Sequence, residues 1–283
     1  MSIADSGGLR FWKGHGTEND FVLLPDPDGA IELTPGLVRS LCDRRAGVGA
    51  DGVLRIVRSA KHPEAAEHAA DAEWFMDFHN ADGTAGEMCG NGLRVFARWL
   101  LTHGEAGPGE FTVATRAGLR RVLPAGDQIT IDAQRPTIGA ATTAWVGDTS
   151  YDGFAVDVGN PHLVCAVASP EQVAGLELFR APRIDPEVLP AGANVEFVAF
   201  DQPAVDGADE HVVMRVHERG VGETRSCGTG ACAVAAVALR RAGRENGVVA
   251  VDVPGGRLVV SLDGPAALLS GPAVLVASGE LTR

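Results

Sequence analysis

A chain of 283 residues with 45% hydrophobic content can bury one large core or two of ordinary size. Its formal net charge of -13 argues against a nucleic acid partner, because binding to a phosphate backbone depends on clustered Lys and Arg. No apolar stretch reaches the roughly eighteen residues of a membrane span, and residues 1–10 lack the basic and apolar regions of an export signal. We therefore expect a cytoplasmic protein without a membrane partner, in which the five cysteines are reduced.

Short segments of alternating apolar residues, bounded by Gly, Pro, Asn and Asp, recur along the whole chain and predict half-buried strands. Because they are found in both halves, the sequence predicts a fold dominated by sheet. The predicted strands cover residues 21–24, 53–57, 74–78, 111–114, 154–158, 163–167, 195–200, 212–216, 248–253 and 258–262.

Two stretches break this alternation and predict one prominent helix in each half. Leu93, Phe96, Ala97 and Leu100 have helical spacing, and the Ala-rich run 231–241 contains no helix breaker. Residues 61–73, rich in Ala, Glu and His, predict an exposed insertion without an assigned function, either a loop or a short surface helix.

Both predicted helices are preceded by the same kind of motif, Cys-Gly-Asn-Gly at 89–92 and Cys-Gly-Thr-Gly at 227–230. A cysteine at a helix start meets backbone N–H groups and the positive end of the helix dipole, which lower a thiol pKa from about 8.5 toward neutrality. The same N–H groups can bind a carboxylate, and the flanking glycines let the ligand approach the backbone. Each motif therefore predicts a thiol base beside a carboxylate site.

Two such thiols fit an enzyme that inverts a stereocentre, because a proton must leave one face of the carbon and arrive on the other. For Cys42, Cys165 and Cys232 we favour the simpler interpretation of a small buried hydrophobic residue. Packing gives no reason for two Gly-flanked cysteines at helix starts, so Cys89 and Cys227 are interpreted as acid/base groups.

Three other patterns are weaker. Residues 47–52 match a dinucleotide-binding fingerprint, but a strand-like run follows them rather than a helix, so we interpret them as a tight turn. The spacing of His217, Cys227 and Cys232 matches no usual zinc motif, and no metal is expected. Lys13 and Lys61 are the only lysines, which makes a pyridoxal phosphate Schiff base a weak interpretation. We expect no cofactor.

Several motifs, in order along the chain, make it resemble the bacterial diaminopimelate epimerases. They are His-Gly-Thr-Glu-Asn-Asp-Phe at 15–21, Asn-Ala-Asp-Gly at 80–83, Glu-Met-Cys-Gly-Asn-Gly at 87–92, Gly-Asn-Pro-His at 159–162, Asn-Val at 194–195, Glu-Arg-Gly at 218–220 and Cys-Gly-Thr-Gly at 227–230.

The resemblance implies an α+β fold of two pseudo-symmetric domains, each a curved sheet around a central helix, with the active site in the cleft between the domains. The N-terminal domain then covers residues 1–135 and carries Cys89, and the C-terminal domain covers residues 136–271 and carries Cys227. The last strand, around 273–277 within the segment 272–283, is expected to return to the N-terminal domain.

The resemblance also implies the reaction, which is epimerisation of LL-2,6-diaminopimelate to its meso isomer for lysine and peptidoglycan synthesis. Cys89 and Cys227 would exchange the α-proton, with His162 and Glu218 beside them. Substrate binding would involve Asn19, Asn80, Gly90, Asn91, Asn160, Asn194, Glu218, Arg219, Gly228 and Thr229. The oligomeric state is left open, with a homodimer as a candidate.

One departure from the family pattern is Thr17-Glu18, where many relatives carry smaller or apolar residues. Rival interpretations are a proline or hydroxyproline racemase, an isomerase of the phenazine-biosynthesis type, and a redox switch formed by Cys89 and Cys227. The matched asparagines and Arg219 favour a substrate with a second amino-acid end, because a proline-like substrate would have no use for them.

Overall fold

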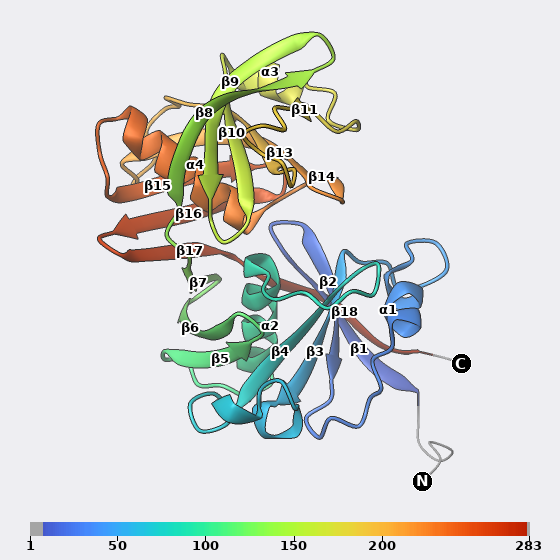
Figure 1. Ribbon diagram of the computed structural model, residues 1–283. Helices are drawn as coiled ribbons and strands as arrows, with labels where there is room; N and C mark the ends of the chain where they lie inside the picture. The colour runs from blue at the N-terminus through green and yellow to red at the C-terminus, as the bar shows by residue number, and fades with distance from the viewer. Residues whose placement is uncertain (1–7, 282–283) are drawn as a thin grey trace. The chain divides into compact units, whose positions relative to one another are not determined.

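The computed structural model describes residues 8–281, which form two compact units (Figure 1). Unit 1 comprises Met1–Gly16, Asp20–Ile129 and Ala273–Arg283, and unit 2 comprises Thr17–Asn19 and Thr130–Pro272. Most of the segment 1–10, in which no export signal is expected, lies outside the described part of the chain.

Unit 1 is built on a mixed sheet. β18 pairs antiparallel with β1, β1 pairs with β2, and from there β2–β3 is parallel, β3–β4 antiparallel, β4–β5 parallel and β5–β6 antiparallel. The strands are β1 (Leu9–Gly16), β2 (Asn19–Pro25), β3 (Gly52–Arg58), β4 (Trp74–Asn80), β5 (Phe111–Thr115), β6 (Gly118–Ala125) and β18 (Val274–Leu281).

Unit 2 repeats this order of pairing. β9–β10 is antiparallel, β10–β12 parallel, β12–β13 antiparallel, β13–β15 parallel and β15–β16 antiparallel, so parallel and antiparallel pairs alternate as in unit 1. The strands are β8 (Thr137–Val146), β9 (Thr149–Asp157), β10 (Pro161–Val167), β11 (Arg183–Ile184), β12 (Asn194–Ala199), β13 (Glu210–Glu218), β14 (Gly222–Thr224), β15 (Gly247–Val253), β16 (Gly256–Asp263) and β17 (Ala266–Pro272). β7 (Gln128–Ala133) pairs with β17.

Each unit has one long helix that packs on its sheet. α2 (Gly90–Thr102) lies against β1, β3, β4 and β18, and α4 (Gly228–Arg241) lies against β10, β12, β13, β15 and β16 (Figure 1). Nearly all of α4 is buried, which its small Ala and Val side chains permit because they let the helix approach the strands closely. The opposite face of each sheet is covered by a shorter helix, α1 (Pro35–Cys42) on β3 and α3 (Pro170–Ala174) on β10, β12 and β13.

The strands that carry the site have both faces buried. In β10 and β12, Leu163, Cys165, Val195 and Phe197 belong to the core that includes Val173 of α3. Because side chains alternate along a strand, the residues between them occupy the other face of the sheet, where α4 packs. This alternation places polar residues of β10 and β12 near the start of α4.

The ten strands and two main helices expected from the sequence are present, and the fold class of two similar sheet-and-helix units is confirmed. The last strand returns to unit 1, as the resemblance implied: β18 pairs with β1 from Leu281 to Val274. The insertion begins at the end of the short 3-10 helix η1 (Ser59–Lys61) and contains a second one, η2 (Ala66–His68). Residues 44–48 form turns and bends before β3.

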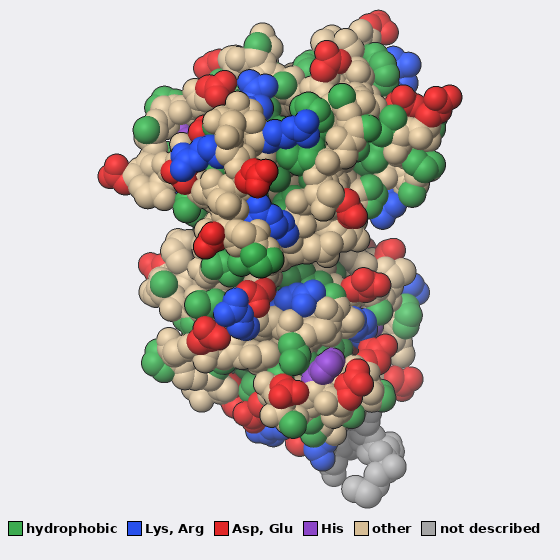
Figure 2. All heavy atoms as spheres, turned by 60° about the vertical axis from the view of Figure 1, so that its left-hand side comes forward, with side chains coloured by type: hydrophobic (Ala, Val, Ile, Leu, Met, Phe, Trp, Pro, Cys, Tyr) green, Lys and Arg blue, Asp and Glu red, His purple; other side chains and the backbone are tan. Residues whose placement is uncertain are grey.

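Within residues 8–281, no helix is long and apolar enough to cross a membrane. On the face drawn in Figure 2, Asp and Glu side chains are interspersed with Lys and Arg. This face shows no continuous basic patch of the kind that binds a phosphate backbone.

Candidate active site

The two motif cysteines are the N-caps of the two long helices. The Cys89 Sγ accepts a hydrogen bond from the Gly92 N–H over 3.4 Å, and the Cys227 Sγ accepts one from the Gly230 N–H over 3.4 Å. Both cysteines have extended backbone, as N-cap residues usually do. The helix-start position expected from the sequence is therefore present twice, with the same local geometry.

The surroundings of Cys227 raise its thiol pKa. Burial is the largest cause, since only 6% of the residue is exposed, and the nearby carboxyl groups of Glu218 and Glu196 act in the same direction. Hydrogen bonds from Thr229 and the Gly230 amide oppose the shift but are outweighed. The sequence-based expectation of a lowered pKa is thus wrong for Cys227, because desolvation exceeds the effect of the helix start.

Glu218, at the end of β13, is the carboxyl group next to Cys227. Burial raises the pKa of Glu218, while hydrogen bonds with Thr224 and with the Cys227 thiol act in the opposite direction. The Thr224 hydroxyl donates to Glu218 Oε1 and holds the carboxyl group in place. A carboxyl and a thiol with raised pKa values, joined by a hydrogen bond, can pass one proton between them.

His162 is fully buried and is held at both ring nitrogens. Its Nδ1 lies 2.7 Å from Glu196 Oε1, and its Nε2 lies 3.1 Å from Asn160 Oδ1 and 3.4 Å from Asn194 Nδ2. The parallel pairing of β10 with β12 creates this group, because it sets His162 beside Asn194 and Val164 beside Glu196. Sheet register thus brings together His162 and Asn194, and Asn160, two residues before His162, completes the group.

Glu196 belongs to this cluster but was not expected from the sequence. It is completely buried, and its Oε2 has no hydrogen-bond partner among residues 8–281. A Cβ on Gly230 would lie 2.7 Å from Glu196 Oε1, so the carboxyl group sits directly against the first turn of α4. A signal was present: a carboxylate two residues after Asn194, within an otherwise apolar strand, has to lie on the same face as Asn194.

Asn194 also fixes the backbone at Arg219. Its Oδ1 accepts the Arg219 N–H over 2.9 Å, and the Arg219 guanidinium donates to the Ala191 carbonyl over 2.9 Å. One nitrogen of the Arg219 guanidinium therefore already has a hydrogen-bond partner. Arg219 itself lies in the exposed turn that follows β13.

In unit 1 the expected residues lie at the end of β4 and at the start of α2. The Asn91 side chain is buried and its Oδ1 accepts a hydrogen bond from Arg94 over 2.9 Å, so the side chain stabilises the helix start. Asn80, at the end of β4, is exposed and donates to Thr84 Oγ1 over 3.0 Å across a tight loop. Gly90 is the first residue of α2.

Thr17 and Glu18 form the two-residue turn between β1 and β2, and both have positive φ, 50° and 61°. A β-branched residue is strained there, and a type I′ turn favours Asn or Gly instead. The Thr17 hydroxyl lies 2.5 Å from the Ser226 hydroxyl, and Glu18 forms an ion pair with Arg225. These contacts hold the turn, and with it Asn19, against the residues that precede Cys227 within unit 2.

The remaining expected residues, Gly228 and Thr229, form the first turn of α4, where the Thr229 hydroxyl lies 3.5 Å from the Cys227 Sγ. Among residues 8–281, no group of three or more His, Cys, Asp and Glu side chains is arranged to hold a metal ion.

The sequence matches the family model described as "Diaminopimelate epimerase" over residues 11–135 and 154–276. Among curated relatives, a diaminopimelate epimerase of Streptomyces coelicolor is 48% identical, with 96% of this chain and 95% of the relative covered. One of Thermobifida fusca is 50% identical, with 96% and 98% covered.

Solved structures with a similar fold are more distant in sequence. A probable proline racemase from Agrobacterium radiobacter with bound carbonate has a TM-score of 0.63 at 17% identity, with 97% of this chain and 93% of that chain covered. A putative phenazine biosynthesis protein from Clostridium difficile has a TM-score of 0.67 at 12% identity, with 97% and 100% covered. At these identities the likeness shows the fold.

Proposed function

Because the chain belongs to the diaminopimelate epimerase family, we propose that it interconverts LL- and meso-2,6-diaminopimelate with Cys89 and Cys227 as the two acid/base groups. The resemblance inferred from the motifs is confirmed by the family match over most of the chain. The observation that carries the proposal for the chemistry is the repeated cysteine N-cap, once in each unit.

The reaction needs a base on one face of the α-carbon and an acid on the other. One thiolate removes the α-proton, and the opposite thiol delivers a proton to the planar intermediate. As the α-proton leaves and before the second proton arrives, negative charge develops on the substrate carboxylate, and backbone N–H groups at a helix start are suited to stabilise it. Since the Gly92 and Gly230 amides already donate to sulfur, we assign this role to the amides of Gly90, Asn91, Gly228 and Thr229.

Cys227 starts as the protonated thiol, and therefore as the acid, because burial together with Glu218 and Glu196 raises its pKa. Before the reverse reaction Cys227 must lose its proton, and the hydrogen-bonded Glu218 carboxylate is placed to accept it. Glu196 orients His162 through Nδ1, which fixes the position of Nε2 beside Asn160 and Asn194.

Recognition of the distal amino-acid group is assigned to Asn80, Asn160, Asn194 and Arg219, with Asn19 near the reacting end. An asparagine offers both a donor and an acceptor to an ammonium and carboxylate pair, and Arg219 can bind a carboxylate. Asn194 supports this assignment, because it connects the His162 cluster to the Arg219 backbone.

The test is exchange of the α-proton in deuterated buffer, with LL-diaminopimelate and proline as competing candidate substrates and a reductant present. Cys89→Ala and Cys227→Ala are each expected to abolish epimerisation, since either change removes one of the two proton-transfer groups.

Cys42→Ala and Cys165→Ala provide matched controls, one buried core cysteine in each unit, and both should retain activity. Turnover by either Cys89→Ala or Cys227→Ala at the wild-type rate would refute the two-base chemistry. Turnover of proline but not of diaminopimelate would refute the assigned substrate.

We further propose that the protein acts in the cytoplasm, in the synthesis of lysine and peptidoglycan precursors, without metal or coenzyme and with a homodimer as its candidate assembly. Retention of full activity after exhaustive dialysis against a chelator, and the mass measured by light scattering, test the last two points.

A further inference from the structure

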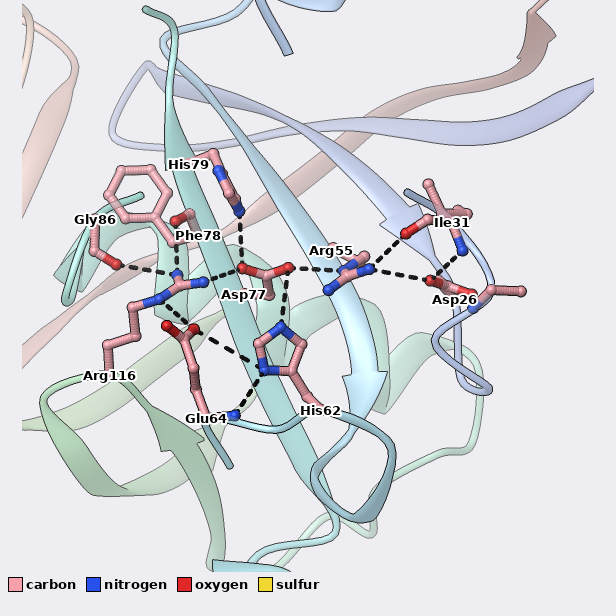
Figure 3. Close-up of polar contacts among 11 residues, drawn as sticks. Asp26, Ile31, Arg55, His62, Glu64, Asp77, Phe78, His79, Gly86 and Arg116 are labelled. Atoms are coloured by element: carbon pink, nitrogen blue, oxygen red, sulfur yellow. Dashed lines mark hydrogen bonds and ion pairs between the residues drawn. The ribbon is translucent and has the colours of Figure 1, made fainter. Parts of the chain in front are cut away.

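A second cluster of charged side chains lies in unit 1, around the buried carboxylate of Asp77 on β4 (Figure 3). Asp77 Oδ2 accepts from Arg55 Nε over 2.7 Å, and Asp77 Oδ1 accepts from Arg116 Nη2 over 2.6 Å and lies 2.9 Å from His79 Nε2. Asp77 has no place in the reaction proposed above. However, β4 ends at Asn80 and leads directly into residues 81–89, the Cys89 loop.

Arg116, in the turn between β5 and β6, links this cluster to that loop. Its Nη1 donates to the Phe78 carbonyl over 3.0 Å and to the Gly86 carbonyl over 3.3 Å (Figure 3). The neighbouring Ala117 N–H donates to the Glu87 carbonyl over 3.2 Å. One turn thus holds the chain just before Asn80 and just before Cys89.

The loop between these anchor points is compact, so displacement of one end is transmitted to the other. The Asn80 N–H donates to the Thr84 carbonyl over 2.9 Å, and His79 forms an isolated β-bridge with Ala85. A Cβ on Gly86 would lie 2.5 Å from the Phe78 ring, so the second end of the loop packs directly on the first.

The outer side of Arg116 is held by the insertion. Its Nε donates to Glu64 Oε2 over 2.8 Å, and the neighbouring His62 ring lies 3.8 Å from Asp77 Oδ2 (Figure 3). The Arg116 guanidinium therefore donates to four acceptors, two carboxylates and two backbone carbonyls. Only a planar group with several N–H donors can make all of these hydrogen bonds.

We propose that Arg116 is a positioning residue that sets the geometry of the Cys89 thiol through the Phe78 and Gly86 carbonyls, with the 61–73 insertion as its outer support through Glu64. This rests on the proposed function only in giving Cys89 its catalytic role. Arg116 itself touches neither thiol nor substrate.

Arg55 provides the matched control, because it bonds the same Asp77 carboxylate over 2.7 Å but otherwise contacts the Ile31 carbonyl and Asp26, away from the Cys89 loop. If Arg116 only neutralised buried Asp77, then Arg55→Lys and Arg116→Lys would have the same effect on Cys89.

The experiment is a timed reaction of the whole protein with iodoacetamide, followed by mass spectrometry of the peptides that contain Cys89 and Cys227. Cys227, in the other unit, serves as the internal reference in every sample. Arg116→Lys should change the ratio of Cys89 to Cys227 alkylation by about threefold or more. It should also lower kcat about tenfold with KM nearly constant, because small displacements of a reacting group are costly.

Arg55→Lys should leave the alkylation ratio and kcat unchanged, and Glu64→Gln should shift the ratio in the same direction as Arg116→Lys, but less. An unchanged ratio in folded Arg116→Lys, or an equal shift in Arg55→Lys, would overturn the positioning role. If Arg116→Lys does not fold, Glu64→Gln decides, and an unchanged ratio there overturns the proposal.

Alkylation needs no substrate, so the result does not depend on whether diaminopimelate is the substrate. Failure of the wild-type protein to epimerise diaminopimelate would remove the proposed function and leave the alkylation ratios as they are.

Discussion

Replacing Glu196 tests whether the buried His162 cluster contributes to turnover. Glu196 Oε1 lies 2.7 Å from His162 Nδ1, and neither residue is exposed, so bulk water does not reach this hydrogen bond. Leaving the buried His162 ring nitrogen without its partner costs about 2 kcal/mol. Carried fully into the activation free energy, this cost lowers kcat of Glu196→Ala roughly thirtyfold. Glu196→Gln keeps a hydrogen-bond acceptor but loses the charge, so we expect the activation free energy to rise by about 1 kcal/mol and kcat to fall roughly fivefold.

The assay is kcat and KM for epimerisation, with the reduction expected in kcat because Glu196 is not assigned a contact with substrate. Glu196→Gln should also speed the alkylation of Cys227, since the Glu196 charge raises the pKa of that thiol. Glu187→Gln and Glu187→Ala, at an exposed position of the same unit, are the matched controls. A folded Glu196→Ala variant with wild-type kcat would refute the role assigned to the His162 and Glu196 pair.

Three further predictions concern protonation and packing. The alkylation rate of Cys227 should continue to rise above about pH 9, because its pKa is raised; a plateau below about pH 8 would contradict this. For Asp77, burial alone would raise the pKa, but hydrogen bonds from His79 and Arg116 and the charge of Arg55 hold it below its usual range. The resulting stability is present above about pH 4 and is lost as pH falls through the lower folded value. The difference in urea unfolding free energy between wild type and Asp77→Asn should therefore be larger at pH 7 than at the lowest pH at which both fold, and equal differences would be inconsistent with it. Gly86→Ala should destabilise the protein by about 1–3 kcal/mol through overlap with the Phe78 ring, whereas Gly107→Ala, with open space around it, should match wild type in the same unfolding measurement.

The main strands and helices could be predicted because their apolar patterns are local. The short helices α1 and α3 were not predicted, although each has a local signal. Thr34 caps α1 before Pro35, and Ser169 caps α3 before Pro170. The second half of β9 could be predicted, at 154–158, but β8 and the first half of β9 have many exposed and small side chains, so their alternation is too weak to read from the sequence.

The position of the two thiols could be predicted because an N-cap depends only on the residues that follow it. Glu196 could not be linked to His162 in the same way, since that contact depends on the register of β10 against β12. The direction of the Cys227 pKa shift depends on tertiary burial and on carboxyl groups from other strands, and no local motif contains either.

The return of β18 to unit 1 has a consequence for synthesis on the ribosome. β1 receives its β18 partner only from Val274–Leu281, after the whole of unit 2 has been translated. Until then the nascent N-terminal segment exposes one edge of β1, and such an edge invites pairing with other chains. Unit 2, whose strands from β7 to β17 are contiguous, can complete its sheet earlier, so the unit made first is the last to be finished.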